Sequence, residues 1–168
     1  AIDAPIDAWT PGDASLSKIA LLQYTSGSTA HPRGVMVTHD NILFQVKGIG
    51  FWDVPDASGV SWLPLFHDLG LFGGVLAPLY AGRRAIFMQP TSFVLRPMRW
   101  IEAMSRFRAT TSGAPTFGYE LCASKARPEE FHGLDLSNWK IALVGAETVR
   151  ADTLERFAKV FEPCGFRA

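Results

Sequence analysis

The segment from Thr25 to Gly34, TSGSTAHPRG, constrains this chain more than any other stretch. Between apolar runs at 19–24 and 35–37, it holds four hydroxyl side chains, two glycines and one arginine. Hydroxyl and backbone N–H groups donate to phosphate oxygens, glycine lets the backbone approach a ligand, and a cation offsets phosphate charge. We therefore predict a polyphosphate-binding loop that follows a buried strand. An ordinary solvated loop is the alternative, and a Walker loop is excluded because no Gly-Lys-Ser/Thr closes the segment.

Composition narrows the class of protein. A chain of 168 residues can form one ordinary domain with a real core. Its formal net charge is zero, with 16 basic and 16 acidic residues, which indicates neither a nucleic acid nor an anionic membrane as partner. The first residues show no secretory-signal pattern, so we expect none, and the most apolar window, 69–81, is short and interrupted by glycine and proline. Cys122 and Cys164 lack metal-ligand spacing, so we expect reduced packing cysteines in a cytoplasmic protein without a transmembrane segment.

The pattern along the chain predicts an α/β fold. Residues 1–17 show no periodicity and are predicted to be a leading segment or linker, followed by a partial domain at 18–168. There, apolar runs alternate with helical patterns, which favours a mostly parallel sheet flanked by helices on both faces. The predicted strands are 19–24, 35–37, 59–63, 84–88, 110–112 and 140–144. The predicted helices are 40–50, 69–80, 97–107, 116–126 and 150–161, the last with Leu154, Phe157, Ala158 and Phe161 on one face.

Three further segments place polar or small residues just after a predicted strand, where open α/β sheets bind their ligands. They are His67-Asp68 after 59–63, the run 113–119 after 110–112, and Gly145-Ala146-Glu147 after 140–144. The first two segments each have a structural alternative. His67 could cap a helix, and Phe117 and Tyr119 could be ordinary core aromatics. The residue pattern alone leaves both alternatives open.

The phosphate-loop segment resembles that of adenylate-forming enzymes. Tyr24-Thr25-Ser26-Gly27-Ser28-Thr29 is followed by Pro32, a basic residue and Gly34, as in acyl-CoA synthetases, luciferases, peptide-synthetase adenylation domains and fatty acyl-AMP ligases. The string WLPLFHDLGL at 62–71 is similar to the fatty acyl-AMP ligases, and GAETV at 145–149 resembles the loop that lies against adenine. Most acyl-CoA synthetases carry Gly and Lys where this chain has Ala30 and Arg33, which favours the acyl-AMP ligase branch. In the adenine loop, Thr148 replaces the usual proline.

The resemblance implies an enzyme that joins ATP to a medium- or long-chain fatty acid as an acyl-adenylate and releases pyrophosphate. It implies that His67 borders the reacting carboxylate as the catalytic residue, and that 113–119 follows an apolar acyl tunnel. The implied ATP-binding residues are Thr25, Ser26, Gly27, Ser28, Thr29, Arg33, Gly34, Gly145, Ala146 and Glu147. The implied acyl-binding residues are His67, Asp68, Gly113, Ala114, Pro115, Phe117 and Tyr119.

The resemblance runs from residue 19 to about 166 and matches the middle of the family's large N-terminal domain. It implies ATP with Mg²⁺, whose expected glutamate ligand lies beyond this chain, and an acyl carrier protein or CoA as the acceptor. We expect the 168 residues to be a fragment without turnover of its own. Two alternatives stay open: a fragment of an acyl-CoA or aryl-CoA synthetase, and a non-catalytic lipid- or nucleotide-binding module.

Overall fold

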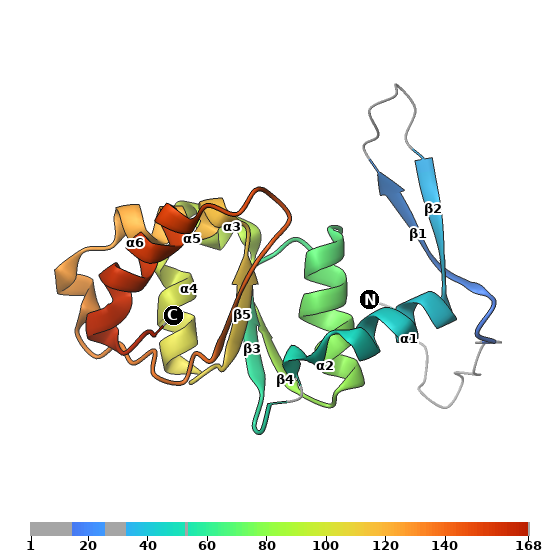
Figure 1. Cartoon of the computed structure of the whole chain (residues 1–168), viewed down its shortest axis with the longest axis horizontal. Helices are drawn as coiled ribbons and strands as arrows, with labels where there is room; N and C mark the ends of the chain where they lie inside the picture. The colour runs from blue at the N-terminus through green and yellow to red at the C-terminus, as the bar shows by residue number, and fades with distance from the viewer. Residues whose placement is uncertain (1–14, 26–32, 53, 168) are drawn as a thin grey trace, which may run out of the picture. The chain divides into compact units, whose positions relative to one another are not determined.

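The computed structural model describes residues 15–25, 33–52 and 54–167 (Figure 1). Contacts divide the chain into two compact units, residues 1–48 and 49–168. The predicted leading segment at 1–17 falls almost entirely outside the described residues. Within the described part, no helix combines the length and the apolar character that a membrane span requires.

The first unit is a β-hairpin followed directly by a helix (Figure 1). Strand β1 (Ile19–Thr25) pairs antiparallel with β2 (Arg33–Thr38), and α1 (His39–Gly48) begins at the next residue. The start of α1 has a reciprocal cap. The backbone N–H and hydroxyl of Thr38 donate to Asn41 Oδ1 at 3.0 and 2.9 Å, and the Asn41 N–H donates to Thr38 Oγ1 at 3.2 Å. The two strands and the helix predicted here are confirmed.

The hairpin corrects one expectation. The run at 19–24 was expected to be a buried strand, but Ile19 and Leu22 are 53% and 50% exposed. Among the described residues of this unit, Val46 alone is buried. The reason is that a two-stranded hairpin has two faces, and the described part of this unit supplies no second layer to cover them. Apolar composition alone therefore did not predict burial.

The second unit is built on a four-stranded parallel sheet with the strand order β4-β3-β5-β6. Its strands are β3 (Ser58–Ser61), β4 (Arg84–Phe87), β5 (Thr111–Ala114) and β6 (Ile141–Val144). Its π-helix and α-helices are η3 (Leu69–Leu76), α2 (Ala77–Tyr80), α3 (Pro90–Leu95), α4 (Met98–Arg106), α5 (Thr116–Lys125) and α6 (Ala151–Phe161). Short turns of helix occur at η2 (Gly50–Trp52), η4 (Pro128–Phe131) and η5 (Glu162–Cys164).

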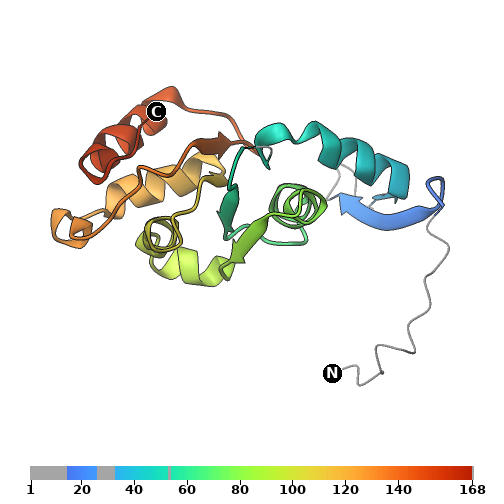
Figure 2. The same cartoon turned by 90° about the horizontal axis from the view of Figure 1, so that it is seen from below.

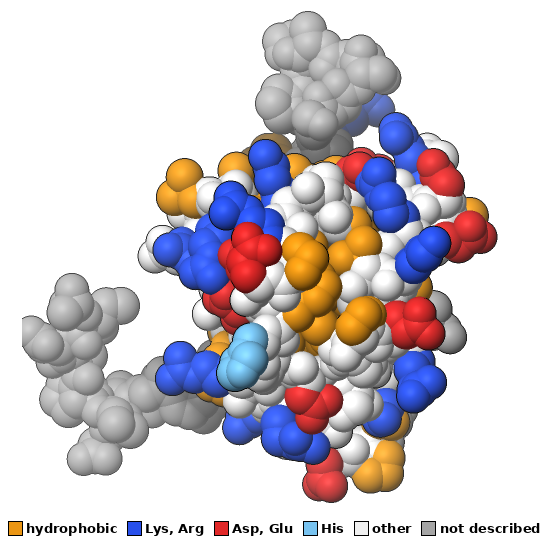
Figure 3. All heavy atoms as spheres, turned by 90° about the vertical axis from the view of Figure 1, so that its left-hand side faces the viewer, with side chains coloured by type: hydrophobic (Ala, Val, Ile, Leu, Met, Phe, Trp, Pro, Cys, Tyr) orange, Lys and Arg blue, Asp and Glu red, His pale blue; other side chains and the backbone are white. Residues whose placement is uncertain are grey.

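Helices cover both faces of this sheet. Figures 1 and 2 show η3 and α2 on one face and α4, α5 and α6 on the other. The predicted α/β fold with a parallel sheet is therefore confirmed. Seen from the side in Figure 3, basic and acidic side chains intermingle around a small apolar strip, in keeping with a formal net charge of zero.

Aromatic rings fill the core between the sheet and α4 to α6. Trp62 stacks on Phe93 with ring centroids 3.7 Å apart, and Trp100 packs edge-on against Tyr119 and Trp139. The Trp100 Nε1–H donates to Ser112 Oγ at 2.8 Å, and that hydroxyl donates to the Val60 carbonyl at 2.5 Å. This chain of hydrogen bonds joins α4 to β5 and β3. The high aromatic content of the sequence is thus used in packing.

Two helical elements differ from the prediction. The helix expected at 69–80 consists of two elements. Its first eight residues form the π-helix η3, and only its last four residues, α2, are α-helical. Three glycines in η3 remove the side chains that normally define an α-helical surface, and π-helices often occur at functional sites. The short helix α3 was not predicted at all. In α6 the predicted face is confirmed, with Phe157 and Phe161 fully buried.

Candidate functional site

Three of the predicted site segments lie at one edge of the parallel sheet. The turn with His67 follows β3, the run 113–119 spans the end of β5 and the start of α5, and the loop 145–147 follows β6. The carboxyl ends of parallel strands meet at the same edge of a sheet. The structure therefore brings together the residues that the sequence indicated for the acid and for adenine.

His67 and Asp68 form a close pair at the start of η3. His67 Nδ1 lies 2.7 Å from Asp68 Oδ1, and it also accepts from the Leu69 N–H at 3.2 Å. The Leu69 N–H donates to the same carboxylate oxygen at 2.6 Å, so Asp68 is the N-cap of η3. The alternative role considered for His67, helix capping, stays open, because its Nδ1 and Asp68 Oδ1 accept from the same N–H of η3. The half-exposed imidazole keeps Nε2 as its second polar atom.

A tight turn fixes the position of His67. Its backbone N–H donates to the Pro64 carbonyl at 3.1 Å, and its own carbonyl accepts from the Leu71 N–H at 2.9 Å. A Cβ atom on Gly70 would lie 2.2 Å from the Pro64 carbonyl oxygen, so only glycine allows this approach of the two backbones. The glycine three residues after His67 is therefore part of what places the imidazole.

The predicted adenine loop is fastened to the N-terminus of α5. Glu147 Oε1 accepts from the Phe117 N–H at 2.7 Å, and the Thr116 hydroxyl donates to the Thr148 carbonyl at 3.0 Å. A carboxylate at this position satisfies a free helix N–H and complements the positive end of the helix. Ala146 has φ of 66°, a left-handed conformation that is unfavourable for alanine. The Glu147 side chain thus caps the N-terminus of α5 and thereby holds the loop against that helix.

The predicted acyl-binding residues separate into two groups. Gly113 lines a cavity beside the sheet, and Phe117 is 44% exposed near the Glu147 carboxylate. Ala114 and Tyr119 are buried, and the Tyr119 hydroxyl donates to the Leu143 carbonyl at 2.8 Å. Burial raises the pKa of the Tyr119 phenol well above its ordinary value. The structure places Tyr119 in the aromatic core.

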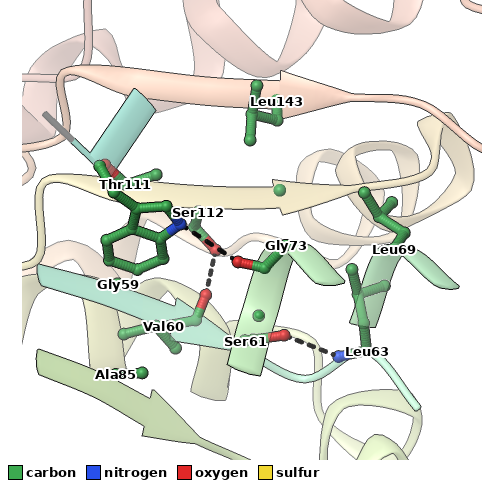
Figure 4. A pocket seen from close by; sticks show the side chains of 13 residues that line it. Gly59, Val60, Ser61, Leu63, Leu69, Gly73, Ala85, Thr111, Ser112 and Leu143 are labelled. Atoms are coloured by element: carbon green, nitrogen blue, oxygen red, sulfur yellow. Dashed lines mark hydrogen bonds between the residues drawn. The ribbon is translucent and has the colours of Figure 1, made fainter. Parts of the chain in front are cut away.

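An apolar cavity runs along the face of the sheet that η3 covers (Figure 4). It contains about 400 Å³ of space between atoms, including its opening to solvent. The lining residues are Trp52, Gly59, Val60, Ser61, Leu63, Leu69, Gly73, Gly74, Ala85, Thr111, Ser112, Gly113 and Leu143. Most of them were missed by sequence reasoning. The glycines of η3 were the one available signal, since a helix surface without side chains leaves room beside a sheet.

The predicted phosphate loop belongs to the first unit. Thr25 and Arg33 form a backbone pair at the ends of β1 and β2, and Gly34 pairs with Tyr24. Both ends of the predicted loop are thus held side by side by the hairpin. The predicted ligands Ser26, Gly27, Ser28 and Thr29 lie outside the described residues. Among the residues that are described, no three His, Cys, Asp or Glu side chains gather as a metal site would require.

A parallel sheet whose cavity reaches its carboxyl edge is typical of α/β domains that bind small molecules. Residues 3–166 match the AMP-binding enzyme family, and the chain belongs to this family. It is 42% identical over 165 residues to the medium-chain-fatty-acid–[acyl-carrier-protein] ligase TtuA of Teredinibacter turnerae. It is 43% identical over 174 residues to the long-chain-fatty-acid–AMP ligase FadD23 of Mycobacterium tuberculosis.

These alignments cover 97% and 99% of this chain but 26% and 30% of the two relatives. A solved structure of fatty acyl-adenylate ligase from L. pneumophila, in complex with acyl adenylate and pyrophosphate, superimposes with a TM-score of 0.90. The sequence identity there is 45%, over 96% of this chain and 29% of the other. The chain therefore spans between a quarter and a third of the length of these proteins.

Proposed function

We propose that this chain is part of a longer ligase that joins ATP and a medium- or long-chain fatty acid into an acyl-adenylate, with release of pyrophosphate. One observation carries the proposal. The His67–Asp68 pair, the cavity wall at Gly113 and the fastened loop at 145–147 converge on one edge of the sheet. The relatives named as fatty acid ligases and the acyl-adenylate complex support the same class of substrate.

In this proposal two separate segments of the chain contribute to nucleotide binding. The hydroxyl and N–H groups of residues 25–29 bind the β- and γ-phosphates, and Arg33 offsets their charge. Adenine lies against the backbone of 145–147, whose shape the Glu147 cap maintains. The resemblance implies that the glutamate ligand of the Mg²⁺ that accompanies ATP lies beyond this chain.

The reaction needs positioning more than covalent chemistry from the protein. A carboxylate oxygen of the acid forms a bond to the α-phosphorus while the bond to the bridging oxygen breaks, and pyrophosphate leaves with the electron pair. Holding the two reactants in line and stabilising charge accounts for most of the catalysis. Asp68 and the Leu69 N–H hold His67 at Nδ1, which leaves Nε2 to contact the carboxylate and orient the acid.

The direct test is a product analysis on the full-length ligase. The enzyme is incubated with ATP, Mg²⁺ and dodecanoate, with and without CoA or an acyl carrier protein, and products are identified by mass spectrometry. Acyl-adenylate that persists in the presence of CoA supports an acyl-AMP ligase, and its transfer to the carrier protein identifies the acceptor. Acyl-CoA would indicate the synthetase alternative. Absence of both products would indicate the non-catalytic binding module.

Two variants test the site within this assay. His67→Ala should lower kcat by about a hundredfold if the imidazole orients the carboxylate. His132→Ala is the matched control, since His132 is exposed and lies at the end of η4, away from the sheet edge. We further propose that residues 1–168 alone do not turn over, and robust adenylation by the isolated chain would refute that part.

A further inference from the structure

Trp52 lines the cavity near the start of β3, whereas Leu63 and Leu69, which flank His67 in the sequence, line it beyond the strand ends. Its side chain is 4% exposed and lines the cavity beside Gly59, the second residue of β3. Figure 4 shows Gly59 and Ala85 near the start of their strands and Leu63 and Leu69 beyond the strand ends. A Cβ atom on Gly59 would lie 2.3 Å from Trp52 Cη2, so the indole covers this glycine directly. The ring therefore stands where a chain entering from the carboxyl edge would stop.

A hydrogen bond to η3 holds the indole of Trp52 in place, at a carbonyl group that lacks its partner within the helix. In a π-helix, the carbonyl of one residue accepts from the N–H five residues later. For Gly73 that residue is Pro78, which has no N–H. The Trp52 Nε1–H donates to the Gly73 carbonyl instead, at 3.2 Å. The Trp52 carbonyl in turn accepts from Arg83 Nε at 3.3 Å. Both ends of the residue are therefore tied down.

The distance available suits a medium-length chain. From Gly59 to Leu63 the backbone advances four residues, which is about 13 Å at about 3.3 Å per residue. An extended alkyl chain advances about 1.3 Å per carbon, given C–C bonds of about 1.5 Å, so this length holds about ten carbons. Glycines at 73, 74 and 113 and the apolar side chains of Val60 and Leu143 line the path. Such walls suit a saturated hydrocarbon.

We propose that Trp52 closes the inner end of the acyl cavity and sets the length of fatty acid that the enzyme accepts. The inference rests on the function proposed above and names its specificity-determining residue. A purely structural role for Trp52, as a clasp between η2 and η3, is the competing explanation. The two differ in what they predict for acids of different length.

The experiment measures kcat/KM of the full-length ligase for acyl-adenylate formation with saturated acids from hexanoate to octadecanoate. Trp52→Ala should move the optimum two or more carbons upward, because each further methylene that the opened cavity buries is worth about fourfold. The ratio of kcat/KM for hexadecanoate to that for decanoate should rise at least about tenfold. Trp52→Phe keeps an aromatic ring but loses the hydrogen bond to the Gly73 carbonyl, so it should move the optimal chain length by less.

Two control variants separate specificity from stability. Trp139 is also 4% exposed, and its Nε1–H donates to the Ile141 carbonyl at 2.9 Å, but it does not line the cavity. Trp139→Phe should lower the melting temperature without changing the length profile. Gly74→Ala places a methyl carbon 3.2 Å from Ser61 Oγ on the cavity wall and should disfavour the longer acids.

The outcomes are distinct. A length profile unchanged in Trp52→Ala, with a folded enzyme that still forms acyl-adenylate, overturns the inference and leaves the proposed function standing. Should Trp52→Ala fail to fold, unchanged profiles in both Trp52→Phe and Gly74→Ala overturn it equally. If the unaltered enzyme adenylates none of the acids, the proposed function fails and this inference fails with it.

Discussion

The hairpin unit and the sheet unit place their predicted ligand-binding residues by different means. In the hairpin, Met36 and Tyr24 are 66% and 63% exposed, and Val46 is the single buried residue among those described. The sheet unit instead surrounds Trp100 with further aromatic rings and leaves it fully buried. In the hairpin, local backbone pairing positions the ends of the predicted loop, whereas in the sheet unit long-range packing positions the candidate site. Substitutions in the two units should therefore act on different quantities.

The largest effect is expected in the phosphate loop. Gly27→Val in the full-length ligase should lower the rate of acyl-adenylate formation by about a thousandfold or more, because a branched side chain blocks the approach of the backbone to phosphate. The melting temperature should stay close to that of the unaltered enzyme, since the hairpin contributes little buried surface. Pyrophosphate release and a thermal melt measure both quantities.

The matched control is Gly48→Val in the same unit. Gly48 is the last residue of α1, and a Cβ atom there would meet nothing within 4 Å. This variant should keep the rate within about twofold, because open space and a helical conformation accommodate the side chain. Unchanged kinetics in Gly27→Val would remove the loop from the mechanism, and an equal loss in Gly48→Val would show that any added bulk in this unit is harmful.

The next effect is on the stability of the sheet unit. Trp100→Ala should lower the free energy of unfolding by about 3–5 kcal/mol, because it leaves a large cavity in the core. Met36→Ala in the hairpin should change it by no more than about 0.5 kcal/mol. Urea denaturation of the 168-residue chain, followed by far-UV circular dichroism, compares the two. A similar loss in both variants would mean that the hairpin contributes to the cooperative core after all.

The contrast also explains what the sequence could predict. The alternation of apolar runs predicted the parallel sheet and most helices, because strand and helix periodicity are local properties. The convergence of His67, Gly113 and Glu147 also followed, since parallel strands end at one edge. Hydrophobicity overstated the burial of β1, because the composition of a strand does not reveal whether a second layer covers it.

Features that depend on contacts between distant residues were not predictable. The indole of Trp52 lines the cavity because Pro78 leaves the Gly73 carbonyl without its helical donor, a relation across 21 residues. Glu147 was identified as a nucleotide ligand by resemblance, but its carboxylate caps a helix that begins 31 residues earlier, at Thr116. No local pattern reports either contact. They became visible only when the sheet placed these segments together.

A third prediction concerns alkaline pH and the packed core. Burial raises the pKa of both Tyr119 and Cys122 in the folded chain. The unfolded chain ionises these groups near their ordinary pKa values, about 8.5 for Cys and about 10 for Tyr, so it binds fewer protons than the folded chain at high pH. Their stabilising effect is complete below about pH 8.5 and is lost as the pH rises, by about 2 kcal/mol between pH 8 and pH 10.

The midpoints of urea denaturation, measured from pH 7 to pH 10, test this loss of stability with rising pH. Cys122→Ala should be less stable at neutral pH, because it empties part of a fully buried site. Its stability should nevertheless fall less steeply above pH 8.5, since the variant lacks the main titrating group. Equal slopes in the two proteins would assign the alkaline loss to other residues.

The smallest effect concerns the backbone of the adenine loop. Ala146 adopts φ of 66°, where a Cβ atom costs about 1 kcal/mol, so Ala146→Gly should raise the free energy of unfolding by about 0.5–1 kcal/mol. Ala142→Gly, in the exposed position of β6, should lower it by a similar amount because glycine weakens a strand. Both variants remove the same methyl group within five residues, so opposite signs would identify backbone conformation as the cause. If both variants are destabilised alike, the left-handed conformation of Ala146 is not under strain.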